Sequence, residues 1–146
     1  MIDHELLVDV LRRESRSFLQ YVRESYPWAS VSESALRDQI LVLADREAEI
    51  LARIARLLQS RRVPLPILGT FPTSYTNSNF LAARALIPRL LEDGRRLLAD
   101  LDRDVEFVTD EQGRQLLEAL QQRKREHLQI LEGMNSSAAS AAAASA

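Results

Sequence analysis

Apolar residues recur every three or four positions in four segments of the chain, the spacing that places them on one face of an α-helix. Three of these segments cover residues 3–25, 79–102 and 109–133, and the remaining one follows Ser30. Aromatic residues make up 5% of the chain and there are four glycines, a composition that favours helices over a sheet. We therefore predict an all-α protein whose four helices pack together as a bundle.

The first two predicted helices are joined by a short turn. Pro27 ends the first helix, because proline disfavours a helical conformation in the residue before it. Ser30 and Glu33 have the spacing of a capping box, which predicts the start of the second helix. With so few residues between them, the two helices should form an antiparallel hairpin. We expect Tyr26, Pro27 and Trp28 to form an apolar plug at this end of the bundle.

Residues 62–78 form the longest connection between the predicted helices. The connection is rich in proline, threonine and serine, yet it carries five large apolar residues: Val63, Leu65, Ile67, Leu68 and Phe71. An extended segment of this length reaches up to about 56 Å, whereas a helix of about 25 residues is about 37 Å long. We predict a long crossover that lies lengthwise against the helices and makes the second and third helices parallel. The alternative is a surface loop.

Further signals concern the last two helices and the end of the chain. Pro88 lies inside the third predicted helix and should kink or interrupt it. Gly133 suits the end of the fourth helix. From residue 136 onward the chain contains only serine and alanine, and a segment without an apolar face is expected to be disordered. We therefore predict one domain over residues 1–134 and a disordered tail over residues 135–146.

The overall composition argues against several classes of function. The chain has 146 residues and a net charge of −2, with 19 basic and 21 acidic residues interspersed along it. Nucleic acids and anionic membranes are bound by concentrated basic surfaces. We therefore expect neither of them as a partner, and leave a protein partner or a homo-oligomer open. The absence of cysteine excludes disulfides and thiolate metal sites.

The sequence also bears on location. The first five residues are acidic and have no positive segment followed by a long apolar run, so they do not predict a secretory signal. The longest uncharged stretch, residues 63–83, contains several prolines and does not predict a membrane helix. We expect a cytoplasmic protein.

Four charged or titratable residues interrupt the apolar faces of the predicted helices. Glu14 lies in the first helix, Glu47 in the second, and Lys124, the only lysine of the chain, lies with His127 in the fourth. A charge inside a bundle is costly unless it is neutralised by a partner or a bound ligand. We expect these four side chains to meet at one depth as a buried polar layer.

Two helical hairpins joined by a long crossover, with Glu14 and Glu47 at one height, resemble the ferritin-like superfamily. Its di-iron members supply a glutamate from each of two helices and a Glu-x-x-His motif from each of the other two. By this resemblance Glu14 takes the place of a single glutamate, and Glu47 takes the glutamate of a motif whose histidine place holds Ile50. His127 takes a histidine place in the fourth helix, where Lys124 replaces the glutamate.

The differences from the family pattern indicate a degenerate di-iron site. In the third helix Leu90 and Gly94 hold the inward positions. The four negative charges of four carboxylates balance the four positive charges of two ferrous ions. Two carboxylates and an ammonium group do not supply that charge. We expect the charge of Lys124, with a partly protonated His127, to replace the metal charge. The resemblance then implies a metal-free, non-catalytic ferritin-like bundle without a cofactor, acting as a structural or protein-interaction module.

The alternative is a ferritin-like metal-binding protein or oxidoreductase with a reduced, mononuclear site. In that case Glu14, Glu47 and His127 would hold one iron or manganese ion. Lys124 would have to lose its proton or move away. A divalent ion about 4 Å from an ammonium group meets a repulsion of about 8 kcal/mol at an effective dielectric constant of about 20. We therefore rank this alternative second.

Overall fold

The protein is all-helical in the computed structural model, which describes residues 2–78 and 81–145, with side chains described between residues 4 and 137. No strand occurs within these residues. The elements in chain order are α1 (Ile2–Ser15), α2 (Phe18–Ser25), α3 (Ser34–Ser60), the 3₁₀-helix η1 (Thr73–Ser78), α4 (Ala83–Phe107) and α5 (Glu111–Ser145).

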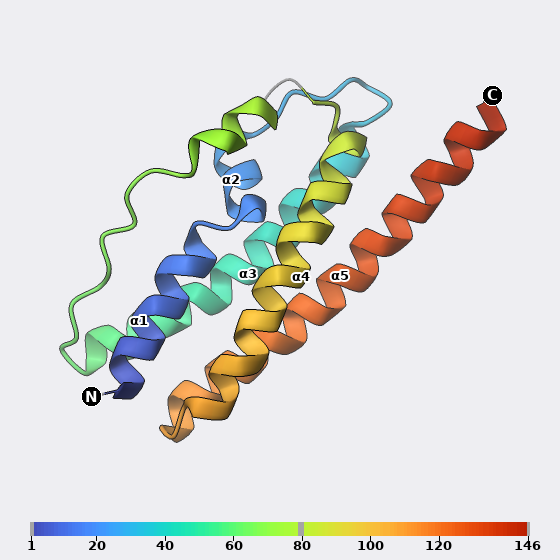
Figure 1. Cartoon of the computed structure of the whole chain (residues 1–146). Coiled ribbons are helices and arrows are strands. Elements are labelled where there is room, and N and C mark those ends of the chain that lie inside the picture. The colour runs from blue at the N-terminus through green and yellow to red at the C-terminus, as the bar shows by residue number, and fades with distance from the viewer. Residues whose placement is uncertain (1, 79–80, 146) are drawn as a thin grey trace.

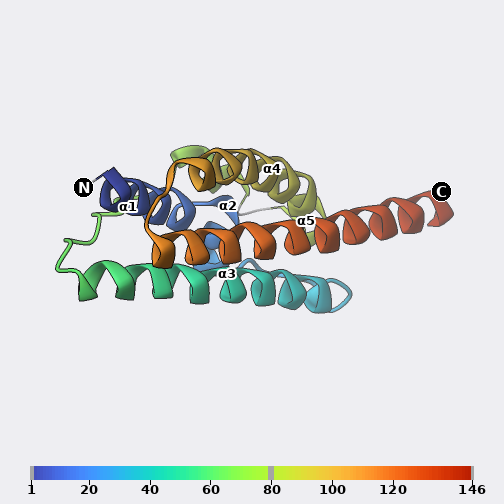
Figure 2. The same ribbon diagram turned by 90° about the horizontal axis from the view of Figure 1, so that it is seen from below.

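The long helices lie side by side along one direction (Figures 1 and 2). The chain runs one way through α1 and α2, and α3 returns in the opposite direction. The connection after α3 then passes back along the side of α1, so that α4 begins near the end of the molecule where α3 begins and runs parallel to it. The last helix, α5, is antiparallel to α4 and extends beyond it.

The first predicted helix, residues 3–25, is interrupted in the structure. Ser17 has an extended conformation (φ −64°, ψ 158°), and its hydroxyl oxygen accepts a hydrogen bond from the backbone N–H of Gln20. The carboxylate of Asp93 on α4 accepts a second one from the backbone N–H of Phe18, at 2.9 Å. These two bonds satisfy N–H groups that a helix start leaves free, so α2 begins here as a separate helix.

We predict that Ser17→Ala lowers the free energy of unfolding by about 1 kcal/mol, since it removes the side-chain cap of α2. Chemical denaturation of the purified variant measures this loss. Ser136→Ala is the matched control, because Ser136 is exposed within α5 and its removal should leave stability almost unchanged. Equal effects of the two substitutions would show that the cap does not contribute.

The predicted capping box at the start of α3 is wrong. The helix begins at Ser34, and the side chain of Glu33 makes no capping bond to it. Instead, the Glu33 carboxylate accepts a hydrogen bond of 2.9 Å from the backbone N–H of Ala83, at the start of α4. A carboxylate is favourable near a helix N-terminus, and here it comes from a residue remote in sequence.

The last two helices also differ from the prediction at their ends and at Pro88. The third predicted helix starts at Ala83 rather than at residue 79, and it continues through Pro88 without a break. α5 passes Gly133 and is helical to Ser145. Residue 146 lies outside the described residues, and the disordered tail over residues 135–146 stays a prediction. Alanine has the highest helix propensity, whereas one glycine costs only about 1 kcal/mol.

The interior contains two apolar clusters, one at each end of the bundle. The first combines α2 with parts of α3, α4 and α5, and includes Phe18, Ala44 and Leu128. The second combines α1 with other parts of the same helices, and includes Leu11 and Ile50. Along α1 and α2, and again along α3, the chain passes from one cluster to the other across a buried glutamate. Glu14 and Glu47 therefore lie between the two clusters.

The apolar side chains of the connection are only partly buried. Val63 packs against the second cluster, and the ring of Phe71 lies 5.3 Å from that of Tyr21. In contrast, Ile67 is 92% exposed, and Leu65 and Leu68 are each 40% exposed. These three apolar side chains of the connection are therefore partly or almost fully exposed.

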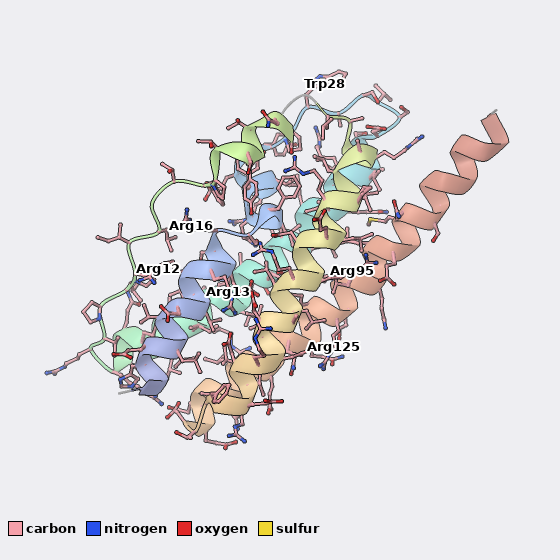
Figure 3. The ribbon with its side chains drawn as sticks, viewed as in Figure 1. Arg12, Arg13, Arg16, Trp28, Arg95 and Arg125 are labelled. Carbon is pink, nitrogen blue, oxygen red and sulfur yellow. The ribbon has the colours of Figure 1, made fainter. Side chains whose placement is uncertain are left out.

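The turn between α2 and α3 does not form the apolar plug that we expected. Pro27 is buried, but Tyr26 is 60% exposed and Trp28 is 80% exposed. Trp28 lies at the outer end of the molecule, away from the core (Figure 3). Among the described residues, no helix is both long enough and apolar enough to cross a membrane.

Candidate functional site: a buried polar layer

Glu14, Glu47, Lys124 and His127 come from three helices and are all buried, at 2%, 4%, 3% and 2% exposure respectively. Glu14 lies in the last turn of α1, and Glu47 lies in the middle of α3. Lys124 and His127 are separated by three positions on α5, which puts them on the same face of that helix. We call these four residues the polar layer.

The structure brings all four side chains of the polar layer into one network. Lys124 Nζ donates a hydrogen bond to Glu47 Oε1 at 2.9 Å and lies 3.3 Å from Glu14 Oε1. The other oxygen of Glu47, Oε2, lies 2.5 Å from His127 Nδ1. Glu47 therefore has a partner on each oxygen, whereas Lys124 is the one residue of the layer with which Glu14 forms an ion pair.

Because their partners differ, the pKa values of the two glutamates shift in opposite directions. Burial alone would raise the pKa of Glu47, but Lys124 and His127 outweigh it and lower this pKa to about 2. Burial raises the pKa of Glu14 above its ordinary value, and Lys124 only partly offsets the effect. Burial also disfavours the charged form of Lys124, yet the two glutamates raise its pKa above the ordinary value. The central charge pair is thus Lys124 with Glu47.

Glu47 should make stability depend on acid. Its pKa is about 2 in the folded protein against an ordinary value of 4.5, so its stabilising contribution is present above pH 4.5 and is lost as the pH falls towards 2. We predict that the parent loses about 3 kcal/mol more than Glu47→Gln between these limits. Denaturant unfolding at several pH values measures this difference.

Two other glutamates, one exposed and one in the polar layer, provide controls. Glu118 is exposed on α5, so Glu118→Gln should keep the acid dependence of the parent. Glu14 has a raised pKa, so its protonation favours the folded state and its contribution has the opposite sign: stability falls as the pH rises from the ordinary value to the raised one. Glu14→Gln should therefore remove that fall. A parent and a Glu47→Gln variant with parallel pH profiles would contradict the assignment.

The residues that the resemblance places at the other ligand positions do not complete a metal centre. Within the described part of the chain, no group of three or more histidine, cysteine, aspartate or glutamate side chains is arranged to hold a metal ion. Ile50, at the histidine place of α3, is buried in the second apolar cluster. On α4, a Cβ atom at Gly94 would lie 2.8 Å from Leu128 Cδ2, so even a small side chain there requires Leu128 to move.

Two polar residues next to the layer, Ser17 and Asp93, are not among the site residues that the sequence pattern predicts. Both line a small cavity that Glu47, Lys124 and His127 also line. Ser17 and Gln20 have the spacing of a capping box, a signal that could have revealed the helix break within the predicted first helix. Asp93 carries no such local signal, because its partner Phe18 is distant in sequence.

Comparisons of the chain with protein-family models, with curated proteins and with solved structures find no significant match.

Proposed function

We propose that this chain is a non-catalytic, metal-free bundle of ferritin-like architecture that acts as a structural or protein-interaction module. In this proposal Lys124 supplies the positive charge that a metal ion supplies in di-iron relatives. The parallel course of α3 and α4, joined by the long connection, supports the ferritin-like part of the proposal (Figure 1).

One observation carries the metal-free part of the proposal. The ammonium group of Lys124 lies 2.9 Å from Glu47 and 3.3 Å from Glu14, between the two carboxylates that the resemblance assigns to metal binding. A divalent ion at these carboxylates would lie close to Lys124 and meet a repulsion of about 8 kcal/mol at an effective dielectric constant of about 20. The raised pKa of Lys124 makes loss of its proton still more costly.

The size of the space beside the layer supports a non-catalytic role. The cavity has a volume of about 20 Å³, which is room for about one water molecule. Ligand pockets for organic molecules are about 300 Å³ or larger. A substrate would therefore have no room next to Glu47, Lys124 or His127.

The surface supports an interaction role. Large apolar side chains are exposed in two separate places: along the connection, at Leu65, Ile67 and Leu68, and at the turn after α2, at Trp28 and Val31. A groove of about 340 Å³ lies beneath the connection and is lined in part by Leu65 and Leu68. Exposed apolar groups gathered near a groove are typical of surfaces that contact other proteins. Tryptophan in particular is enriched among residues that dominate such contacts.

Metal analysis tests the proposal directly. Purified protein is incubated with ferrous or manganous ions, desalted, and measured for metal content and for melting temperature. We expect far less than one metal ion per chain and no rise in melting temperature, and no oxygen-dependent oxidation of ferrous iron above the rate of a buffer blank. One bound ion per chain that is lost in Glu47→Gln would instead support the mononuclear alternative.

A further inference from the structure

A cavity of about 20 Å³ lies inside the bundle, between the polar layer and α4. Most of its wall is apolar and comes from leucine side chains of α4 and α5. Its polar wall comes from two places: the polar layer, through Glu47, Lys124 and His127, and the break between α1 and α2, through Ser17 and Asp93. The cavity thus lies between two polar regions of the interior, which also share a backbone hydrogen bond of 3.2 Å from the Ser17 N–H to the Glu14 carbonyl.

His127 leaves one nitrogen without a partner at this place. Its Nδ1 faces the Glu47 carboxylate, so Nδ1 carries a hydrogen and donates it. Its Nε2 is buried and has no hydrogen-bond partner among the described residues. A buried nitrogen without a hydrogen-bond partner lowers the free energy of unfolding by about 1–3 kcal/mol, so we expect a partner for Nε2.

We propose that the cavity is a binding site for a single water molecule, which bonds His127 Nε2 and links the polar layer to the α1–α2 break. The volume exceeds the 10–15 Å³ that one water requires, and polar partners are present on both sides. With Nδ1 donating to Glu47, Nε2 bonds the water as an acceptor in the neutral ring and as a donor in the charged ring. The Ser17 oxygen already accepts from the Gln20 N–H, so its own hydroxyl hydrogen is free to point to the water oxygen.

Water fits this site better than a cation. Glu47 has its two oxygens bonded to Lys124 and His127, and Asp93 accepts from Phe18 and from Arg96. The ammonium group of Lys124 also lines the cavity and would repel a positive ion. Asp93 in addition lines a surface pocket of about 170 Å³. The water site is independent of whether the bundle binds a protein partner.

Two measurements on the unmodified chain test the proposal. A crystal structure at high resolution should show one water within about 2.7–3.2 Å of His127 Nε2. In solution, the His127 ring protons should show a nuclear Overhauser cross-peak to a long-lived water. The proposal is overturned by a protein group bonded to Nε2, by an empty cavity, or by an anomalous signal that shows a metal ion there.

A pair of variants localises the water to this cavity. Leu131 lines it, so Leu131→Phe should fill the space and abolish the cross-peak to His127. Leu117→Phe makes the same change in the second apolar cluster, away from the cavity, and should keep the cross-peak. Leu90 also lines the cavity, so Leu90→Phe serves if the Leu131→Phe variant does not fold. A folded Leu131→Phe protein that retains the full cross-peak would overturn the assignment.

Discussion

Lys124→Met should destabilise the protein by about 3–5 kcal/mol, because it leaves two buried carboxylates without their shared partner. Methionine is close to lysine in size and flexibility, so the loss reflects charge rather than packing. The structure makes the reason specific: the ammonium group is buried and contacts both Glu14 and Glu47. Denaturant unfolding at neutral pH measures the free energy of unfolding of parent and variant.

The combined variant Glu14→Gln, Glu47→Gln, Lys124→Met separates charge coupling from independent effects. Removing all three charges together leaves no unpaired ion, so its loss should be much smaller than the sum of the three single losses. Arg125→Met is a matched control for the lysine, because Arg125 is exposed on the same helix and its ion pair with Asp102 contributes little. Additive single and combined effects would show that the three groups act independently.

The residues of the polar layer could be chosen from the sequence because each interrupts a regular apolar stripe. A repeat of three to four positions fixes the face of a helix on which a residue lies. In α3, for example, Glu47 stands between the buried residues Leu43, Ala44 and Ile50. Periodicity along single helices therefore gave the members of the layer and their depth. It did not give their pairing, so the unequal surroundings of Glu14 and Glu47 came only from the structure.

The features that the sequence did not reveal depend on partners distant along the chain. Glu33 looked like the cap of its own helix, yet it bonds to Ala83. The break before Phe18 is completed by Asp93 on α4. Local patterns contain no information about such contacts, since the same side chain can cap any helix start that comes within reach. The exposure of Ile67 likewise depends on which side of the connection faces the helices, and irregular backbone has no fixed period.

If the polar layer descends from a di-iron site, metal affinity should be recoverable in the double variant Ile50→His, Lys124→Glu. The second change removes the cation between Glu14 and Glu47 and restores Glu-x-x-His on α5, while the first restores it on α3. Position 50 is buried one turn along α3 from Glu47, next to the layer. Three carboxylates and two histidines would then lie at one depth, a set of ligands suited to ferrous or manganous ions.

Without metal, the double variant should be less stable than the parent, because its three carboxylates repel one another. Metal at about 100 times its dissociation constant should then stabilise it by about 2.7 kcal/mol, seen as a rise in melting temperature. The parent should show no rise, and Ile50→His alone, which keeps Lys124, is the matched control and should show none either. A folded double variant that is indifferent to both metals would argue that α1, α3 and α5 do not hold these positions at ligand distance. A comparable rise in Ile50→His would show that Lys124 does not exclude metal, which would contradict the central step of the proposed function.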